Sequence, residues 1–308
     1  MLVSVVICTY NRHLSLQDTL ESLIAQTADR ETFEVIVVDN HSDDATRQTV
    51  QEMAGCANLN IRYLYEVRRG KAYALETGIQ EAKGEILAFT DDDVIVDTKW
   101  IENIQKAFIG QRIACLGGRI RPLWLCEKPK WYDERFFGVI VEYDRGDQFM
   151  QIKTGVLPFG ANLILSAEVP KKHGGFRQDL ASASFMRSED TEMCRRLLSN
   201  GEPVYYAPDV VVWHKVTAGR MIKSFFRNWF YTYGAARSRI GIPKESGHRK
   251  IFNVPRWRYR NAITTIFRAM GEGLKGRPSE AFYYETRFWR ELGFIFDRWK
   301  TILGNRDA

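Results

Sequence analysis

Short apolar runs alternate with amphipathic segments along the first third of the chain. Runs rich in β-branched residues predict strands over residues 2–9, 33–39, 61–65 and 85–90. Between them, apolar side chains recur every three or four positions, which predicts helices over residues 15–24, 43–53 and 71–82. Strands that alternate with helices form parallel β-α-β units, and their sheet is covered on both faces. The pattern therefore predicts an α/β fold.

The rhythm changes after about residue 112. Further strands are expected over residues 113–120, 138–143, 159–165, 204–207 and 210–213, and a short helix over residues 188–199. The last part of the chain, residues 215–308, contains aromatic residues at helical spacing with basic residues beside them. We therefore expect a large α/β domain over residues 1–214, followed by a C-terminal helical extension over residues 215–308.

Charge is divided unevenly between these two parts. The formal net charge is +6, yet residues 1–214 carry 24 basic and 31 acidic side chains, whereas residues 215–308 carry 20 and 7. Hydrophobic residues make up 45% of the chain and charged residues 27%, which is typical of a globular protein. The basic, aromatic C-terminal part keeps a nucleic-acid-binding protein as an alternative, but the acidic first part argues against it, and no nucleic-acid partner is expected.

The compartment is predicted from the cysteines and the hydropathy pattern. The five cysteines include no C-x-x-C pair, so they are interpreted as reduced thiols rather than as disulfides or zinc ligands. The first residues show no basic leader or cleavage-site pattern, and no stretch is apolar for long enough to span a bilayer. These features predict a cytoplasmic protein and leave peripheral contact with a membrane open.

Acidic residues stand where several predicted strands end. Asp91, Asp92 and Asp93 close the fourth strand, Asp39 closes the second and Thr9 the first. Ligands of parallel sheets bind beyond the carboxyl ends of the strands, and adjacent carboxylates favour a divalent cation such as Mg²⁺ or Mn²⁺. The alternatives are a solvated acidic turn at residues 91–93 and a helix N-cap at Asp39.

Three further residues are candidates for catalysis or metal binding. Glu189 and Asp190 follow Ser188 at a predicted helix start, where the helix dipole favours negative charge. Such a carboxylate can accept a proton from a hydroxyl group, although a capping role explains it equally well. His214 ends an apolar strand and is interpreted either as a metal ligand or as a structural residue.

Five further segments stand out: SVVICTYNR at 4–12, VIVVDNHS at 35–42, GKAYALETG at 70–78, FTDDD at 89–93 and SEDTE at 188–192. In their order and approximate spacing, they together resemble glycosyltransferase family 2. The similarity covers about residues 1–214. It implies a GT-A fold, a nucleotide-diphosphate sugar donor, a divalent cation and inverting transfer. Arg68 and Arg69 depart from the family pattern, and they are interpreted either as phosphate ligands or as part of a solvated basic loop.

The resemblance also implies a division of labour among the residues. Residues 1–112 would bind the nucleotide sugar, and residues 113–214 would supply the acceptor and catalytic half. Asp190 would be the general base, with Glu189 in support. The expected ligands of Mn²⁺ or Mg²⁺ are Asp91, Asp93 and His214. The expected donor-binding residues are Thr9, Tyr10, Arg12, Asp39, Lys71, Asp91, Asp92 and Asn162.

The remaining expectations concern substrate and surroundings. The sequence predicts transfer from a nucleotide sugar, with UDP compatible with Asp39, to a glycan or polyprenyl-linked acceptor in surface polysaccharide synthesis. A sugar nucleotidyltransferase is the alternative enzyme class, although residues 9–13 are not its Gly-rich loop. The aromatic residues within 222–233 and 288–302 have two interpretations. They either contact the anionic inner face of the cell membrane or pack the helices onto the first domain.

Overall fold

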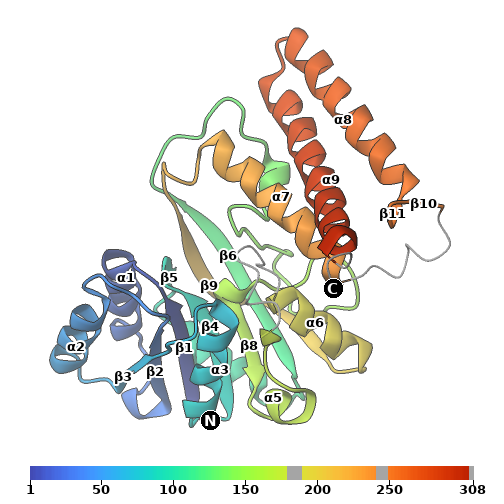
Figure 1. Cartoon of the computed structure of the whole chain (residues 1–308). Coiled ribbons are helices and arrows are strands. Elements are labelled where there is room, and N and C mark those ends of the chain that lie inside the picture. The colour runs from blue at the N-terminus through green and yellow to red at the C-terminus, as the bar shows by residue number, and fades with distance from the viewer. Residues whose placement is uncertain (179–188, 241–248, 305–308) are drawn as a thin grey trace. The chain divides into compact units, whose positions relative to one another are not determined.

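A computed structural model describes residues 1–178, 189–240 and 249–304 (Figure 1). The first strands are β1 (Val3–Thr9), β2 (Phe33–Asp39), β3 (Ile61–Tyr65) and β4 (Ile86–Asp91). They pair in parallel in the order β3-β2-β1-β4. The helices between them are α1 (His13–Ile24), α2 (Thr46–Cys56) and α3 (Lys71–Glu81). The predicted β-α-β organisation is confirmed, with element ends that differ by a few residues.

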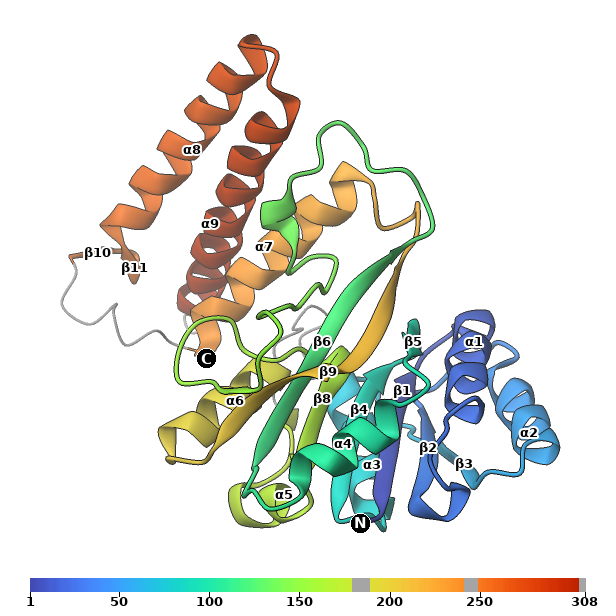
Figure 2. The ribbon, with the colours of Figure 1, turned by 180° about the vertical axis from the view of Figure 1, so that it is seen from behind.

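An antiparallel half continues the sheet beyond β4. Its strands are β5 (Val94–Val96), β6 (Cys115–Trp124), β7 (Met150–Gln151), β8 (Leu163–Ser166) and β9 (Val204–Val216). Among the described residues the sheet has nine strands in the order β3-β2-β1-β4-β8-β6-β9-β5, with β7 paired to β9. Its helices are α4 (Trp100–Phe108), α5 (Glu168–His173) and α6 (Glu189–Ser199). Since α3 lies before the sheet in Figure 1 and α4 before it in Figure 2, both faces are covered.

The structure corrects several predicted elements. Residues 138–143, predicted as a strand, form turns with a single bridge from Tyr143 to Ile120. The two runs at 204–207 and 210–213 belong to one strand, β9, which runs through Pro208 without a break. Neither β5 nor α4 was predicted, and the start of the predicted helix at Ser188 lies outside the described residues. Short 3-10 helices cover Arg30–Thr32, Glu134–Phe136 and Gly160–Asn162.

The chain divides into two compact units. Among the described residues, the first unit consists of residues 1–123, 141–178 and 189–215, and the second of the rest. The second unit contains α7 (Lys223–Ile240), α8 (Arg256–Leu274), α9 (Pro278–Gly304) and a hairpin of β10 (Lys250–Ile251) with β11 (Val254–Pro255). In both views α9 lies between α7 and α8 (Figures 1 and 2).

The segment from residue 124 to residue 140 belongs to the second unit, which differs from the single boundary expected after residue 214. Its aromatic side chains explain this. Phe136 is buried and packs edge-to-face against Phe226 and Phe282, with ring centroids 5.2 and 5.7 Å away. No helix in the described ranges combines the length and apolar character needed to cross a bilayer.

Candidate active site

The carboxyl ends of three neighbouring parallel strands bring the polar candidates together. Thr9 at the end of β1 is in register with Asp39 at the end of β2. On the other side of β1, Cys8 is in register with Asp91 at the end of β4. This edge of an open parallel sheet is where ligands bind. The strand register therefore confirms that the three predicted strand ends meet.

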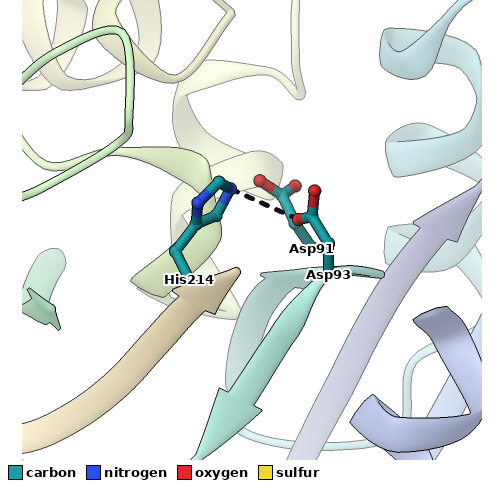
Figure 3. A group of neighbouring side chains, drawn as sticks. All are labelled: Asp91, Asp93 and His214. Carbon is teal, nitrogen blue, oxygen red and sulfur yellow. Dashed lines mark ion pairs between the residues drawn. The ribbon is translucent and has the colours of Figure 1, made fainter. Parts of the chain in front are cut away.

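Asp91, Asp93 and His214 form a compact group of potential metal ligands (Figure 3). One ligand atom from each lies within 4.8 Å of the others, and His214 Nε2 is 3.3 Å from Asp93 Oδ1. The pairing of β5 with β9 creates this group, because it sets Val94 opposite His214 and so brings the preceding Asp93 beside the imidazole. In Figure 3 the imidazole of His214, on β9, points toward the carboxylates of Asp91, at the end of β4, and Asp93, in the turn that follows.

The donor atoms of this group fit a divalent cation. Carboxylate oxygens are preferred ligands of Mg²⁺ and Mn²⁺, and imidazole is a common ligand of first-row transition metals. Asp93 and His214 are only 7% and 1% exposed, so little water solvates the clustered negative charge. Two oxygens and one nitrogen in a buried, acidic setting therefore suit Mn²⁺ at least as well as Mg²⁺.

Asp92 is held by residues at the end of β1. Thr9 Oγ1 donates a hydrogen bond of 2.8 Å to Asp92 Oδ2. Arg12 Nη1 lies 3.0 Å from Asp92 Oδ1 and 3.0 Å from Asp93 Oδ2. Burial raises the pKa of Asp92 to about 6, while Arg12 opposes this shift and repulsion from Asp93 adds to it. Arg12 thus partly neutralises two of the three adjacent carboxylates.

Lys71, the first residue of α3, is the second cation of the site. Its Nζ lies 2.5 Å from Asp91 Oδ1 and 3.9 Å from Glu189 Oε1. Burial disfavours the ammonium charge, but attraction to Asp91 and Glu189 outweighs it and raises the pKa of Lys71. The lysine is therefore charged at neutral pH. It links the metal-type group on the sheet to the carboxylates of α6.

Glu189 and Asp190 open α6, as the sequence predicts. The backbone N–H groups of Gly160 and Thr191 donate to the two oxygens of Asp190 at 2.8 and 2.5 Å. Burial raises the pKa of Asp190, and repulsion from Asp91 adds to this, although the two amides and Lys71 stabilise the charged form. Burial also raises the pKa of Glu189, against the attraction of Lys71. The carboxylates are thus held in place and made more basic than in water.

Asn162, which is expected to contact the donor, has its side chain engaged inside the protein. It is fully buried. Its Nδ2 donates to the carbonyl oxygens of Arg119 and Val210 at 3.0 and 2.9 Å, and its Oδ1 accepts from Trp100 Nε1 at 3.0 Å. The side chain therefore joins β6 and β9 to α4. The Gly-Ala-Asn stretch instead reaches the site through the N–H of Gly160, which no side-chain pattern could reveal.

Asp39 is held by a tyrosine that the sequence did not single out. Tyr63 on β3 donates a hydrogen bond of 2.7 Å to Asp39 Oδ2, and the N–H of Ser42 donates to Oδ1 at 2.8 Å. Asp39 is not the N-cap of α2, since that helix begins at Thr46, whose N–H is bound by Asp44. The signal for Tyr63 was its place in a neighbouring parallel strand that ends at the same edge.

The remaining donor candidate, Tyr10, is 49% exposed at the end of β1. The adjoining loop is tied to the loop after β2, because Asn11 N–H donates to Ser42 Oγ and Asp43 N–H donates to Asn11 Oδ1, both at 2.9 Å. Tyr10 therefore starts a braced loop with an accessible ring. Arg68, one of the two arginines that depart from the family pattern, forms an ion pair with Glu66, with 2.7 Å between Nη2 and Oε2.

Family membership follows from comparison with known proteins. The model of Glycosyl transferase family 2 matches residues 4–167, more than half of the chain. The chain belongs to glycosyl transferase family 2. This confirms the resemblance and favours a glycosyltransferase over the nucleotidyltransferase and nucleic-acid-binding alternatives.

Similar proteins extend this result over most of the chain. The chain is 28% identical over 262 residues to the glucosyl-dolichyl phosphate glucuronosyltransferase of Haloferax volcanii, which covers 82% of each protein. It is 23% identical over 254 residues to the succinoglycan biosynthesis protein ExoM of Rhizobium meliloti, covering 82% of this chain and 79% of that one.

Solved structures show the same fold. The mannosyltransferase PcManGT from Pyrobaculum calidifontis, in complex with GDP-Man and Mn²⁺, matches with a TM-score of 0.67 at 19% identity. The match covers 97% of this chain and 87% of that one. The predicted GT-A fold with C-terminal helices is confirmed.

Proposed function

We propose that this chain is an inverting glycosyltransferase that uses a nucleotide-diphosphate sugar and a divalent cation. The observation that carries this proposal is the arrangement of two groups within one unit. Asp91, Asp93 and His214 form a metal-type cluster, and Lys71 connects Asp91 to the α6 carboxylates. Such a site would hold a cation for a diphosphate and would supply a base for an attacking hydroxyl.

The donor would be held along the carboxyl edge of the sheet. Thr9, Tyr10 and Asp39 would face the nucleoside, with Tyr63 fixing the orientation of the Asp39 carboxylate. Asp91, Asp93 and His214 would hold Mn²⁺ or Mg²⁺, and the bound ion would neutralise charge on the departing diphosphate. Arg12 and Lys71 are cations placed to exchange carboxylate partners for phosphate oxygens. UDP is the proposed nucleotide, because Asp39 is compatible with uracil recognition.

The chemical step would use Asp190 as the general base. Asp190 would take the proton of the acceptor hydroxyl, whose oxygen forms a bond to the anomeric carbon of the sugar. The bond from that carbon to the diphosphate oxygen breaks on the opposite side, so one displacement inverts the carbon. Gly160 and Thr191 would keep the base aimed through the hydrogen bonds described above. Glu189, beside Lys71, would support the base electrostatically.

The acceptor is proposed to be a hydroxyl of a glycan or a polyprenyl-linked sugar used in surface polysaccharide synthesis. The names of two relatives, a glucosyl-dolichyl phosphate glucuronosyltransferase and a succinoglycan biosynthesis protein, support this class. A lipid-linked acceptor would require the enzyme to work at the inner face of the cell membrane.

Two substitutions separate the base from the cation site. Asp190→Asn should lower transfer by about 10²-fold to 10⁴-fold, because the amide cannot accept the proton, while donor binding persists. Asp93→Ala should weaken Mn²⁺-dependent donor binding by at least about tenfold, because a cation ligand is lost. Calorimetric titration with UDP-sugars and GDP-sugars, with and without Mn²⁺, measures binding, and product formation measures transfer.

Asp209→Asn is the matched control, because this aspartate is exposed on β9 and lies outside the candidate residues. Asp209→Asn should leave both donor binding and sugar transfer unchanged. Full turnover by Asp190→Asn would remove Asp190 as the base. If Asp93→Ala still binds the donor in a Mn²⁺-dependent way, with the affinity of the unchanged protein, Asp93 is not a ligand of the cation.

A further inference from the structure

Helix α8 carries its large apolar side chains on the outside. Four of them, spaced four, three and four residues apart, lie along one face of the helix. We call them the α8 stripe, and their exposed fractions are 57% for Ile263, 66% for Phe267, 60% for Met270 and 91% for Leu274. The buried residues of α8 are Arg258, Ala262 and Ala269. After Arg258, whose guanidinium pairs with Glu291, the helix therefore packs with the small residues Ala262 and Ala269 and exposes large apolar ones, which indicates a surface that another body covers.

Basic side chains frame the α8 stripe. Arg256 and Arg260 are exposed on the same helical face, ahead of the stripe. Lys275 and Arg277 are exposed just beyond its other end. The only acidic residue of α8, Glu272, accepts hydrogen bonds from these last two side chains. The stripe is thus an apolar surface with positive charge at both ends.

The β10-β11 hairpin extends this surface at the start of α8. Ile251 and Phe252 are 42% and 68% exposed. Phe252 lies in the turn with a φ of 48°, an unusual backbone conformation for an aromatic residue. The Tyr259 hydroxyl donates to the Ile251 carbonyl at 3.1 Å, which fixes the hairpin against the first turns of α8. Figures 1 and 2 show the hairpin at this end of the helix.

The aromatic residues of α7 and α9, which the sequence suggested for membrane contact, are used differently. Phe226 on α7 and Phe282 on α9 are buried together, with ring centroids 6.1 Å apart. Phe294 and Ile295 of α9 are also buried. Most of the predicted aromatic side chains on α7 and α9 are therefore buried or half-buried, and among those described Phe296 is exposed, at 40%. The α8 stripe is therefore the main exposed apolar surface on the described helices of this unit.

We propose that the α8 stripe docks on an anionic membrane surface, with α8 lying parallel to that surface. Apolar side chains between basic ones match the acyl and headgroup layers of such a bilayer. A second copy of the chain is a less suitable partner, because pairing two α8 stripes about a two-fold axis would place the basic residues of one helix against those of the other. Nucleic acid would satisfy the charges but leave the apolar side chains facing phosphates. The proposal concerns the second unit and does not depend on the proposed transfer reaction.

The test is vesicle binding by the full chain. Vesicles of phosphatidylglycerol mixed with phosphatidylcholine should sediment the unchanged protein, and vesicles of phosphatidylcholine alone should sediment much less. Phe267→Ser with Leu274→Ser should weaken binding by at least about tenfold, because two apolar anchors are lost. Arg256→Gln with Arg260→Gln should weaken binding to the anionic vesicles by about fivefold for each charge. Both pairs are exposed, so circular dichroism should show unchanged folding.

Leu14→Ser with Ile109→Ser is the matched control, because these side chains are 70% and 71% exposed in the first unit. This control should bind vesicles normally, and Phe267→Ser with Leu274→Ser should hydrolyse a soluble donor normally. Unchanged vesicle binding by the stripe variant overturns the proposal. So does a protein that sediments as a dimer in centrifugation without lipid and becomes a monomer when the stripe is changed. Asp190→Asn should bind vesicles like the unchanged protein. Vesicle binding therefore tests the membrane proposal independently of the proposed transfer reaction.

Discussion

Asp190 combines a fixed position with a raised affinity for protons. Both of its oxygens accept backbone hydrogen bonds, from Gly160 and Thr191, so the side chain has little freedom to rotate. Burial and the nearby charge of Asp91 raise its pKa, and Lys71 limits the rise. Glu189, whose pKa is also raised, lies next to it in the chain. A base placed in this way is closer in proton affinity to the hydroxyl that it must deprotonate.

The raised pKa of Asp190 predicts how activity depends on pH. A base works only when deprotonated, so activity should fall as the pH drops through the raised pKa of the folded enzyme. An exposed aspartate would keep its charge down to about pH 4. We expect kcat/KM to begin to decline on acidification above that value, as measured with saturating Mn²⁺. A level profile down to about pH 4, with the protein still folded, would contradict this prediction.

At the scale of elements, α7 and α9 approach each other unusually closely. A Cβ added to Gly234 on α7 would overlap the carbonyl oxygen of Arg290, and one added to Gly293 on α9 would overlap the carbonyl oxygen of Tyr231. The two glycines thus remove side-chain bulk where the two helices touch. Glycine normally weakens a helix, so its presence on both sides of this contact reflects packing rather than helix propensity.

Replacing a glycine inside a helix with alanine usually stabilises a protein, but replacing one of these two should destabilise it. Gly234→Ala should lower the free energy of unfolding by about 1 to 3 kcal/mol, because the new methyl group forces the two helices apart. Gly271→Ala on α8 is the control, since a Cβ there meets nothing within 4 Å. It should stabilise the protein by up to about 1 kcal/mol. Urea unfolding of both variants gives the comparison, and equal stabilisation by the two would refute the close contact.

At the scale of the whole molecule, net charge and apolar packing divide the chain in different ways. Residues 1–214 carry 24 basic and 31 acidic side chains, and the metal-type group lies among them. The basic excess lies after residue 214, where α8 exposes its stripe. However, residues 124–140 pack with the later helices through Trp131, Tyr132 and Phe136. The second unit is therefore built from two separate stretches of sequence.

This organisation predicts the outcome of truncation. A chain that ends at Lys215 would lose the partners of Phe136 and expose the aromatic side chains around it, so it should be poorly soluble. Replacing Trp131, Tyr132 and Phe136 with polar residues in the truncated chain should restore part of the solubility. The soluble fraction after expression and the binding of an apolar dye measure the effect. A soluble, non-aggregating truncation without these replacements would contradict the prediction.

Much of the candidate site could be predicted from the sequence because its signals are local. Asp39 and Asp91 directly follow apolar runs, and parallel strands necessarily carry such residues to one edge of a sheet. The start of α6 at Glu189 was likewise marked by acidic residues ahead of an amphipathic segment. In contrast, Gly160 contributes through a backbone amide, which leaves no pattern in the sequence. Tyr63 contributes through a cross-strand hydrogen bond, and its place in a neighbouring strand was its only sequence signal.

The sequence by itself determined the parallel half of the sheet, the strand-end carboxylates and the family, because apolar periodicity and short motifs are properties of neighbouring residues. Only the tertiary structure decided that Asn162 is buried by Gly118 and Trp100 rather than turned to a donor. It also decided that α8, rather than α7 or α9, exposes a large apolar face. The physical reason is that burial depends on which elements pack together, and residues distant in sequence determine that packing.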